Sequence, residues 1–559
     1  MIKKLQNPLL ALVLISILGL LLRLYRLDQN IPELYTDEVG HYYYLEHLKN
    51  HTAGPIKELS YLFFTASWFA GLNPLGVRLF SALFGSLVVL IGFYFAKVLA
   101  KEQTKQFIGV GLIYSLLLAL LPWNFAISRL AHTHVPIVVF AGLLHLYLYL
   151  RATSPVSKLI SFVPFLIGSY YYPTLILMSP LTLLVPAKEL IWDNHKYRRQ
   201  VIVAGVIFGL IVTSFMINKY QVTSSESRGL DLAIWRDVNV TADSNLYRGL
   251  ARDSQPSIFS FGQNPENFSN KVLFNFPISV INNFFKNYLS FFSVENLFLR
   301  GDTILRHSTG MVGNFYLGLL PFMIYGAFSF FSSKIKTNTK WLLGLWLVAS
   351  PVPAAITKDG ANYLLRAIAL YPILTYFCAL GIMLFVEKIQ SKSLKILSSL
   401  ALVLIFGFSV YSYFFGYFHV YPSLAKDSFE YGFKELSDFQ KETNATLLIT
   451  WEDKYPYSQF CFWQKLPITV CDLNKTDLQR EMVGDSRVDY PLEKVIFSLP
   501  ENEKDLKLII EKYQPQYLAL SVRFAKNYQN FFAKMKPIKT INNPDGSVSF
   551  YLFDLKNYD

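Results

Sequence analysis

The sequence predicts a polytopic α-helical membrane protein that carries a smaller α/β domain at its C-terminal end. Of the 559 residues, 52% are hydrophobic and only 16% are charged, which is far too apolar for one soluble domain. Up to about residue 418, the chain repeats apolar runs of roughly 20 residues, the length that crosses ~30 Å of hydrocarbon. From about Tyr421 onward, Lys, Glu and Asp are distributed as in a soluble domain.

About eleven membrane spans are expected. Lys and Arg in short loops collect on the cytoplasmic side, and with Lys3 and Lys4 inside, every second loop is basic. The fifth and sixth spans are short and meet at a Tyr-Pro turn. They could instead be one tilted helix with a re-entrant piece, but merging them breaks the alternation. The expected spans lie near 8–24, 76–99, 107–122, 132–150, 159–172, 174–187, 201–217, 312–332, 341–357, 366–387 and 396–418.

This topology divides the chain into two domains. Residues 1–418 form the membrane part, with outer loops at about 25–75 and 218–311, and residues 419–559 form a soluble domain on the extracytoplasmic side of the plasma membrane. No small-residue cleavage site follows the first apolar run before Arg23, so we expect a retained anchor. The formal charge of +13 follows largely from the basic inner loops and does not indicate nucleic-acid binding.

Two adjacent carboxylates, Asp37 and Glu38, follow the first span and lie among aromatic residues. A charge near hydrocarbon is costly unless it faces water, a partner or a substrate. One interpretation is a solvated helix start, because acids at a helix N-terminus interact favourably with its dipole and free N–H groups. The other is a functional pair at the membrane surface, in which Glu38 orients or caps.

Basic residues gather at two places that the topology puts at the outer boundary. Arg300, Arg306 and His307 precede the eighth span, and Lys358 and Arg366 lie between the ninth and tenth spans. Guanidinium groups match phosphate oxygens bidentately. We therefore predict a phosphate-binding site, and the alternative is contact with anionic lipid headgroups without chemistry.

Three further polar residues lie near the expected outer surface. His132 and His134 form an H-x-H pair between the third and fourth spans, but no third metal ligand lies nearby in the sequence. They are weak metal candidates, so no cofactor is predicted and a divalent metal is left open. Arg78, at the outer end of the second span, is expected to snorkel to lipid headgroups rather than face a cavity.

The C-terminal segment is typical of a small α/β domain. Strand-like runs occupy 446–450, 494–498 and 517–521, a helical run follows Glu501, and a hairpin is expected around Asp545. No glycine-rich nucleotide loop is present, so we expect an accessory domain. Cys461 and Cys471 lie in this domain, where a disulfide is chemically allowed but not required.

The order and sidedness of these motifs resemble the GT-C superfamily of membrane glycosyltransferases. More narrowly, the chain is similar to family 39 and its bacterial relatives, which include protein O-mannosyltransferases and the lipid A aminoarabinose transferase. The resemblance covers roughly residues 1–418. The motifs that carry it are Tyr35-Thr-Asp-Glu-Val-Gly-His-Tyr-Tyr44, Arg78-Leu-Phe-Ser-Ala-Leu-Phe-Gly-Ser86 and the segment from Arg300-Gly-Asp to Arg306-His-Ser-Thr-Gly310.

The resemblance implies a reaction and its partners. A sugar would move from a polyprenyl-phosphate donor to a protein, lipid or glycan acceptor on the outer face, with Asp37 as base and inversion at the sugar. Positive groups would steady the departing lipid phosphate. Some relatives carry a second acidic residue between the third and fourth spans, where this chain has His132 and His134.

Three other functions remain open at this stage. A surface-glycan ligase or polymerase would share the lipid-linked donor, and a non-catalytic scaffold needs no donor. A transporter of lipid-linked sugars usually has ionisable or helix-breaking residues at mid-membrane, whereas most charges here lie at span ends. The sequence names neither the sugar nor the acceptor.

Overall fold

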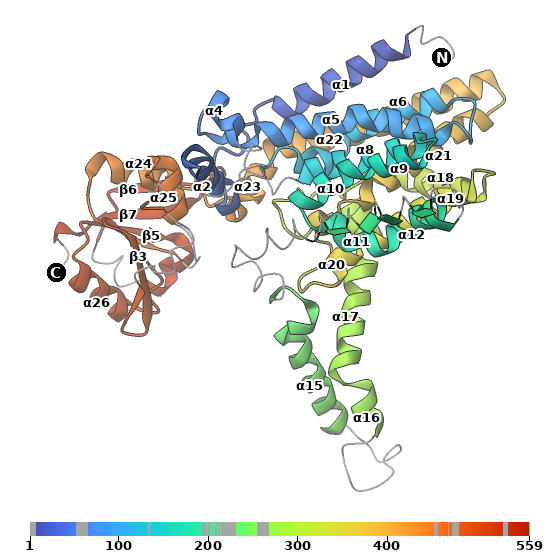
Figure 1. Cartoon of the computed structure of the whole chain (residues 1–559). Coiled ribbons are helices and arrows are strands. Elements are labelled where there is room, and N and C mark those ends of the chain that lie inside the picture. Colours follow the sequence, from blue (N-terminus) through green and yellow to red (C-terminus); the bar gives the residue numbers. More distant parts are fainter. Residues whose placement is uncertain are drawn as a thin grey trace. The chain divides into compact units, whose positions relative to one another are not determined.

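The computed structural model describes residues 7–51, 65–131, 135–192, 198–199, 202–203, 205–206, 209–210, 213, 231–253, 268–451, 457–467, 469–471, 480–528 and 535–557. The chain forms two compact units (Figure 1). The first contains residues 1–23, 81–128 and 133–413, and the second contains residues 24–80, 129–132 and 414–559. The first outer loop, expected at about 25–75, therefore belongs to the same unit as the C-terminal domain. From the sequence, we expected it to belong to the membrane part.

Within the described residues, three helices are long and apolar enough to cross a membrane: α5 (Pro74–Ala100), α21 (Leu370–Lys388) and α22 (Lys392–His419). A fourth span results if the pair Thr174–Thr182 and Leu184–Trp192, bent by 45°, is counted as one. These helices identify an integral membrane protein. The expected number of eleven spans is wrong by this measure.

Several expected spans fail because the helix stops early. The run at 107–122 ends with α6 (Phe107–Leu120), because Leu121 precedes a proline and takes an extended conformation. The run at 159–172 is divided between α9 (Pro155–Ile160) and α10 (Phe162–Tyr171). The run at 201–217 lies mostly outside the described residues.

The first unit packs its helices through small residues. A Cβ atom at Gly326 of α18 (Leu320–Ser332) would lie 1.9 Å from the Phe377 carbonyl oxygen, and one at Gly381 of α21 would lie 2.0 Å from that of Phe322. The two backbones can therefore touch. The other helices of this unit are α1 (Pro8–Leu24), α7 (Pro122–Ile127), α8 (Val135–Arg151), α11 (Thr174–Thr182), α12 (Leu184–Ala187), α15 (Val238–Asp253), α16 (Phe268–Leu273), α17 (Phe276–Ser290), α19 (Thr337–Ala349) and α20 (Val352–Ala355).

The second unit contains a mixed sheet in the order β2-β3-β4-β1-β5-β7-β6, among the described residues. β1 is parallel to β4 and β5, and the remaining pairs are antiparallel. The three predicted strands and the hairpin are confirmed, while β2 and β3 were not predicted. The strands are β1 (Leu447–Thr450), β2 (Arg480–Val483), β3 (Ser486–Leu492), β4 (Val495–Ser498), β5 (Tyr517–Ser521), β6 (Lys539–Asn542) and β7 (Val548–Asp554).

The second unit also contains helices. In α26, Asn502 caps the N-terminus, since its side chain accepts a hydrogen bond from the Asp505 N–H at 2.9 Å. Cys461 and Cys471 form a disulfide, which settles the pairing that the sequence left open. The helices are α2 (Thr36–Asn50), α4 (Ala66–Ala70), α23 (Tyr421–Leu424), α24 (Phe433–Thr443), α25 (Tyr457–Gln464) and α26 (Glu503–Tyr513).

The first outer loop is part of the core of this domain. Leu34, Val39 and Tyr42 pack in one hydrophobic cluster with Phe433 and Phe460. The Tyr42 hydroxyl donates a hydrogen bond to the Leu466 carbonyl at 2.5 Å. Asp37 therefore lies on a helix whose opposite face is fixed by the C-terminal domain.

Candidate active site

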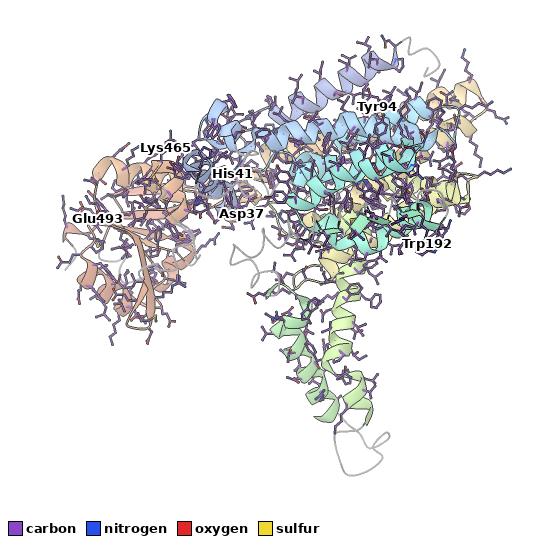
Figure 2. All side chains as sticks on the ribbon, in the orientation of Figure 1. Asp37, His41, Tyr94, Trp192, Lys465 and Glu493 are labelled. Atoms are coloured by element: carbon purple, nitrogen blue, oxygen red, sulfur yellow. A yellow bond between two sulfur atoms is a disulfide. The ribbon has the colours of Figure 1, made fainter. Side chains whose placement is uncertain are left out.

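The two adjacent carboxylates have different environments. α2 begins at Thr36, so Asp37 and Glu38 lie in its first turn. Glu38 is fully buried, whereas Asp37 is exposed. Successive residues of a helix point about 100° apart, so one can enter the protein while its neighbour faces outward. Figure 2 shows Asp37 and His41 on this helix.

Glu38 is held by a bidentate ion pair. The Nε and Nη2 atoms of Arg78 each donate to one Glu38 carboxylate oxygen at 2.8 Å, and Arg78 is itself only 1% exposed. The backbone N–H of Ala131 also donates to Glu38, at 2.9 Å. The carboxylate thus has three donors, which is what a buried charge requires. The orienting role of Glu38 stays a prediction.

Arg78 organises the loop that leads to Asp37. Its Nη1 donates to the Ile31 carbonyl at 2.6 Å and its Nη2 to the Glu33 carbonyl at 2.8 Å. The expectation that Arg78 snorkels to headgroups is wrong. The Arg78 guanidinium is buried because it donates hydrogen bonds to the Glu38 carboxylate and to the Ile31 and Glu33 carbonyls at the same time.

A second buried arginine holds the start of the same loop. Arg129 donates from Nη1 to the Tyr25 carbonyl at 2.8 Å and from Nη2 to the Arg26 carbonyl at 3.1 Å. Its guanidinium lies 5.3 Å from the ring centroids of Tyr417 and Phe418. Sequence reasoning did not identify Arg129. The available signal was a single arginine in the short segment 122–134, which contains no acidic residue to pair with it. Such an arginine needs a partner if it is buried.

Two titratable groups near the acidic pair are kept neutral by burial. Desolvation lowers the pKa of His41 to about 3, although its Nε2 lies 3.3 Å from the Ala131 carbonyl oxygen. Desolvation raises the pKa of Glu33 to about 8, against smaller opposing effects from the Gly432 backbone and Lys434. At neutral pH, both groups are uncharged in the folded protein.

The raised pKa of Glu33 predicts a pH-dependent stability. Between its ordinary pKa of 4.5 and about 8, the folded protein keeps a proton that the unfolded chain has released. The Glu33 contribution to the free energy of unfolding should therefore fall as pH rises through this window, by up to about 1.4 kcal/mol per pH unit. His41, whose pKa is lowered from 6.5 to about 3, contributes the opposite slope below pH 6.5, so the fall should be seen between pH 6.5 and 8. Glu33→Gln should remove this slope in thermal unfolding of the purified protein between pH 6.5 and 8. Glu46→Gln, on α2, is the control, and an unchanged slope in Glu33→Gln would contradict the prediction.

In the first unit, Asp302 fixes the predicted phosphate-binding segment. It accepts hydrogen bonds from the Ile304 N–H at 2.8 Å, the Leu364 N–H at 2.7 Å and His307 Nδ1 at 2.6 Å. The segment that contains His307 is thereby tied to the segment that contains Arg366. Asp302 was not among the predicted site residues, although it lies in the quoted Arg300-Gly-Asp motif.

Tyr363 brings two of the predicted cations together. The His307 ring lies 4.9 Å from the Tyr363 ring, and the Arg366 guanidinium lies 4.1 Å from the same ring centroid. Arg366 Nη1 donates to Thr357 Oγ1 at 2.7 Å and to the Lys358 carbonyl at 3.1 Å. Among the described residues, Nε and Nη2 of Arg366 make no hydrogen bond. This edge of the guanidinium is the one that can chelate an oxyanion.

The other predicted residues have varied surroundings. His307 is buried, Arg306 and Lys358 are half-buried, and Arg300 is exposed beside Glu295, with 3.6 Å between Nη1 and Oε1. His132 and His134 lie outside the described residues, so their weak candidacy as metal ligands stays a prediction.

Comparison with known proteins gives weak structural likeness only. No family model and no curated protein sequence matches the chain. Two crystal structures of the Archaeoglobus fulgidus oligosaccharyltransferase resemble it at 12% identity. The complex with zinc and sulfate covers 97% of this chain and 73% of that one, with a TM-score of 0.44. The form tethered by a disulfide to an acceptor peptide with the NVT sequon covers 98% and 74%, with a TM-score of 0.46. At this level of likeness, neither the fold family nor the function follows from the comparison.

Proposed function

We propose that the protein is a membrane glycosyltransferase of the GT-C type. It moves a sugar from a polyprenyl-phosphate donor to an acceptor hydroxyl on the extracytoplasmic face of the membrane. The proposal rests on the different environments of the two adjacent carboxylates, because Glu38 is buried and Asp37 is exposed. Glu38 is paired with Arg78 and accepts a hydrogen bond from the Ala131 N–H. These contacts fix the first turn of α2, from which Asp37 faces outward.

Asp37 acts as the general base. Its carboxylate takes the proton of the acceptor hydroxyl as that oxygen attacks the anomeric carbon of the donor sugar. The bond from the anomeric carbon to the phosphate oxygen breaks, and its electron pair stays on the polyprenyl phosphate. One displacement inverts the configuration of the sugar. Glu38 positions Asp37 without touching the substrate.

We assign the stabilisation of the departing phosphate to the cations that the sequence predicted. Arg366 is supported by Tyr363, Thr357 and the Lys358 carbonyl, and it keeps the Nε and Nη2 edge for two phosphate oxygens. Arg306 adds a second positive charge. His307 is buried against Asp302, so we assign it to positioning the segment that carries Arg306.

Removing either arginine should slow transfer strongly. Arg306→Ala and Arg366→Ala should each lower the transfer rate about 100-fold, the usual effect of losing one donor to a developing oxyanion. The measurement is transfer by the purified protein, with exposed Arg236→Ala as the matched control. The rate should be unaffected by EDTA. Activity that disappears with EDTA and returns with manganese would refute a metal-free mechanism.

The direct test of the function is product analysis of the donor lipid. A transferase of this kind releases polyprenyl monophosphate, whereas a transporter and a scaffold both leave the donor intact.

A further inference from the structure

The C-terminal domain has a pocket at the point where the connections after two neighbouring strands lead to opposite sides of the sheet. β1 lies between β4 and β5, and all three are parallel. After β1 the chain reaches β4 on one side, and after β5 it reaches β6 and β7 on the other side. The carboxyl ends of β1 and β5 therefore form a topological switch point, which is where open α/β sheets bind ligands.

Residues that follow these two strands line the pocket. Trp451 comes directly after β1, and Ser521 to Arg523 end and follow β5. The Ser521 N–H donates to Thr450 Oγ1 at 2.8 Å, which joins the two strand ends. The pocket measures about 270 Å³. This is below the usual range for drug-sized ligands and fits one small polar unit.

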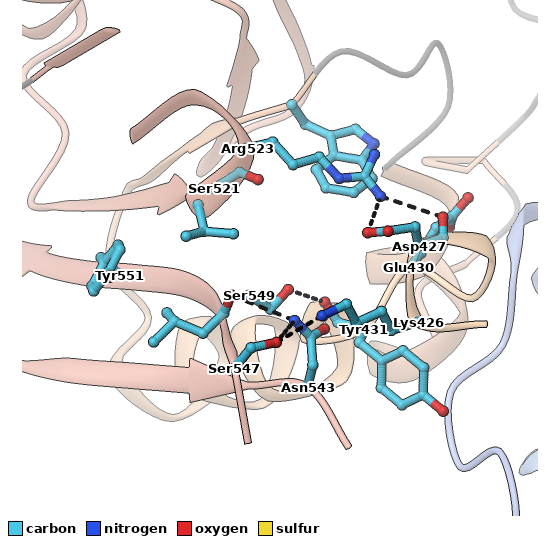
Figure 3. Close-up of a pocket in the computed structure, with 13 residues that line it drawn as sticks. Lys426, Asp427, Glu430, Tyr431, Ser521, Arg523, Asn543, Ser547, Ser549 and Tyr551 are labelled. Atoms are coloured by element: carbon cyan, nitrogen blue, oxygen red, sulfur yellow. Dashed lines mark hydrogen bonds and ion pairs between the residues drawn. The ribbon is translucent and has the colours of Figure 1, made fainter. Parts of the chain in front are cut away.

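The ion pair of Arg523 with Asp427 and the contact of Lys426 with Ser547 lie at opposite sides of the pocket (Figure 3). Arg523 Nη2 lies 2.9 Å from Asp427 Oδ1, and Lys426 Nζ lies 2.6 Å from Asp545 Oδ2. Lys426 also donates to Ser547 Oγ at 3.0 Å. Arg523 and Asp427 offer a donor and an acceptor side by side, and Lys426 and Ser547 do the same at the other side, while Asp545 does not line the pocket. Glu430 adds a second carboxylate to the lining.

The aromatic residues of the pocket hold this arrangement in place. The Arg523 guanidinium lies 5.3 Å from the Trp451 ring centroid. The Trp451 ring in turn lies 5.8 Å from Phe550 and 4.9 Å from Phe433, measured between centroids. Arg523 is therefore supported by a packed aromatic cluster and presents its guanidinium with little loss of freedom.

We propose that this pocket binds one neutral saccharide unit. Each hydroxyl of a sugar is one donor and two acceptors, so two neighbouring hydroxyls match the paired donor and acceptor of Arg523 and Asp427. Lys426 and Ser547 can serve a second pair of hydroxyls. An inorganic anion would meet the carboxylates of Asp427 and Glu430, which line the pocket along with the cations, and their repulsion disfavours it.

This site lies in the accessory domain and goes beyond the proposed transfer reaction. Its ligand is bound, not transformed, so no bond is made or broken in the pocket. Binding can be measured without any transfer assay. A failed transfer experiment and a failed binding experiment are therefore distinguishable.

The test is ligand-observed saturation-transfer NMR on the full chain, in a detergent whose headgroup is not a sugar. The probes are methyl α-D-mannopyranoside, methyl α-D-glucopyranoside and methyl N-acetyl-β-D-glucosaminide. We expect at least one of them to bind. Asp427→Asn should weaken that binding about tenfold, because a charged acceptor is lost.

Asp438→Asn is the matched control, because Asp438 pairs with Lys434 at 2.7 Å on α24 and does not line the pocket. It should bind the probe like the unmodified protein. Three results would overturn the proposal: no binding of any glycoside, equal binding by Asp427→Asn, or Arg523-dependent binding of inorganic phosphate without glycoside binding.

Discussion

Asp37→Asn is expected to lower the rate of sugar transfer by about 10²- to 10⁴-fold, the contribution of a general base. The amide has nearly the shape of the carboxylate but cannot take a proton from the acceptor hydroxyl. Asp37 is exposed in the first turn of α2, so the substitution should leave the thermal unfolding midpoint nearly unchanged. The measurement is transfer by purified protein under single-turnover conditions.

Two matched variants make this result specific. Asp28→Asn changes another acid of the same loop in the same way and should keep the transfer rate. Glu38→Gln should slow the reaction less than Asp37→Asn and should also lower stability, because one oxygen that accepts from Arg78 or Ala131 is lost. If Asp37→Asn transfers sugar as fast as the unmodified protein, the base is a different group.

Arg78→Ala is expected to have the largest effect on stability. It leaves the Glu38 carboxylate buried without its ion-pair partner and removes donors from the Ile31 and Glu33 carbonyls. Breaking a buried pair in this way costs about 3–5 kcal/mol. The thermal unfolding midpoint of the purified protein should fall accordingly, and transfer should fall with it because the loop before Asp37 loses its anchor.

Two further variants separate the ion pair from the rest of the fold. Arg78→Lys should recover little stability, because one ammonium cannot donate to both oxygens of Glu38 and to the carbonyls together. Arg78→Ala combined with Glu38→Ala should lose less than the sum of the single losses, because no unpaired charge is left buried. Additive losses in this double-mutant cycle would show that the pair is not coupled.

The sequence was informative where a local pattern decides the structure. The alternating or apolar runs of β1, β4 and β5 and the Asn-Pro-Asp-Gly turn before β7 were predictable from the residues alone. The helix start at the acidic pair was also predictable, since acids favour a helix N-terminus.

The sequence was less informative where contacts between distant residues decide. Arg78 and Glu38 are 40 residues apart, and no local pattern shows that both are buried. The same is true of Asp302 and Leu364, which are 62 residues apart. The span count failed for another reason, since hydropathy measures how apolar a run is and does not show where a proline or turn divides it.

The central claim is transfer from a polyprenyl-phosphate donor with Asp37 as base, and the fate of the donor lipid tests it most directly. Purified protein would be reconstituted in proteoliposomes with polyprenyl-phosphate-linked sugars and an extract of membrane acceptors, and the lipids analysed by mass spectrometry. The account predicts that polyprenyl monophosphate accumulates with the unmodified protein and with Asp28→Asn, and not with Asp37→Asn. Intact donor in every sample, or equal release by Asp37→Asn, would contradict it.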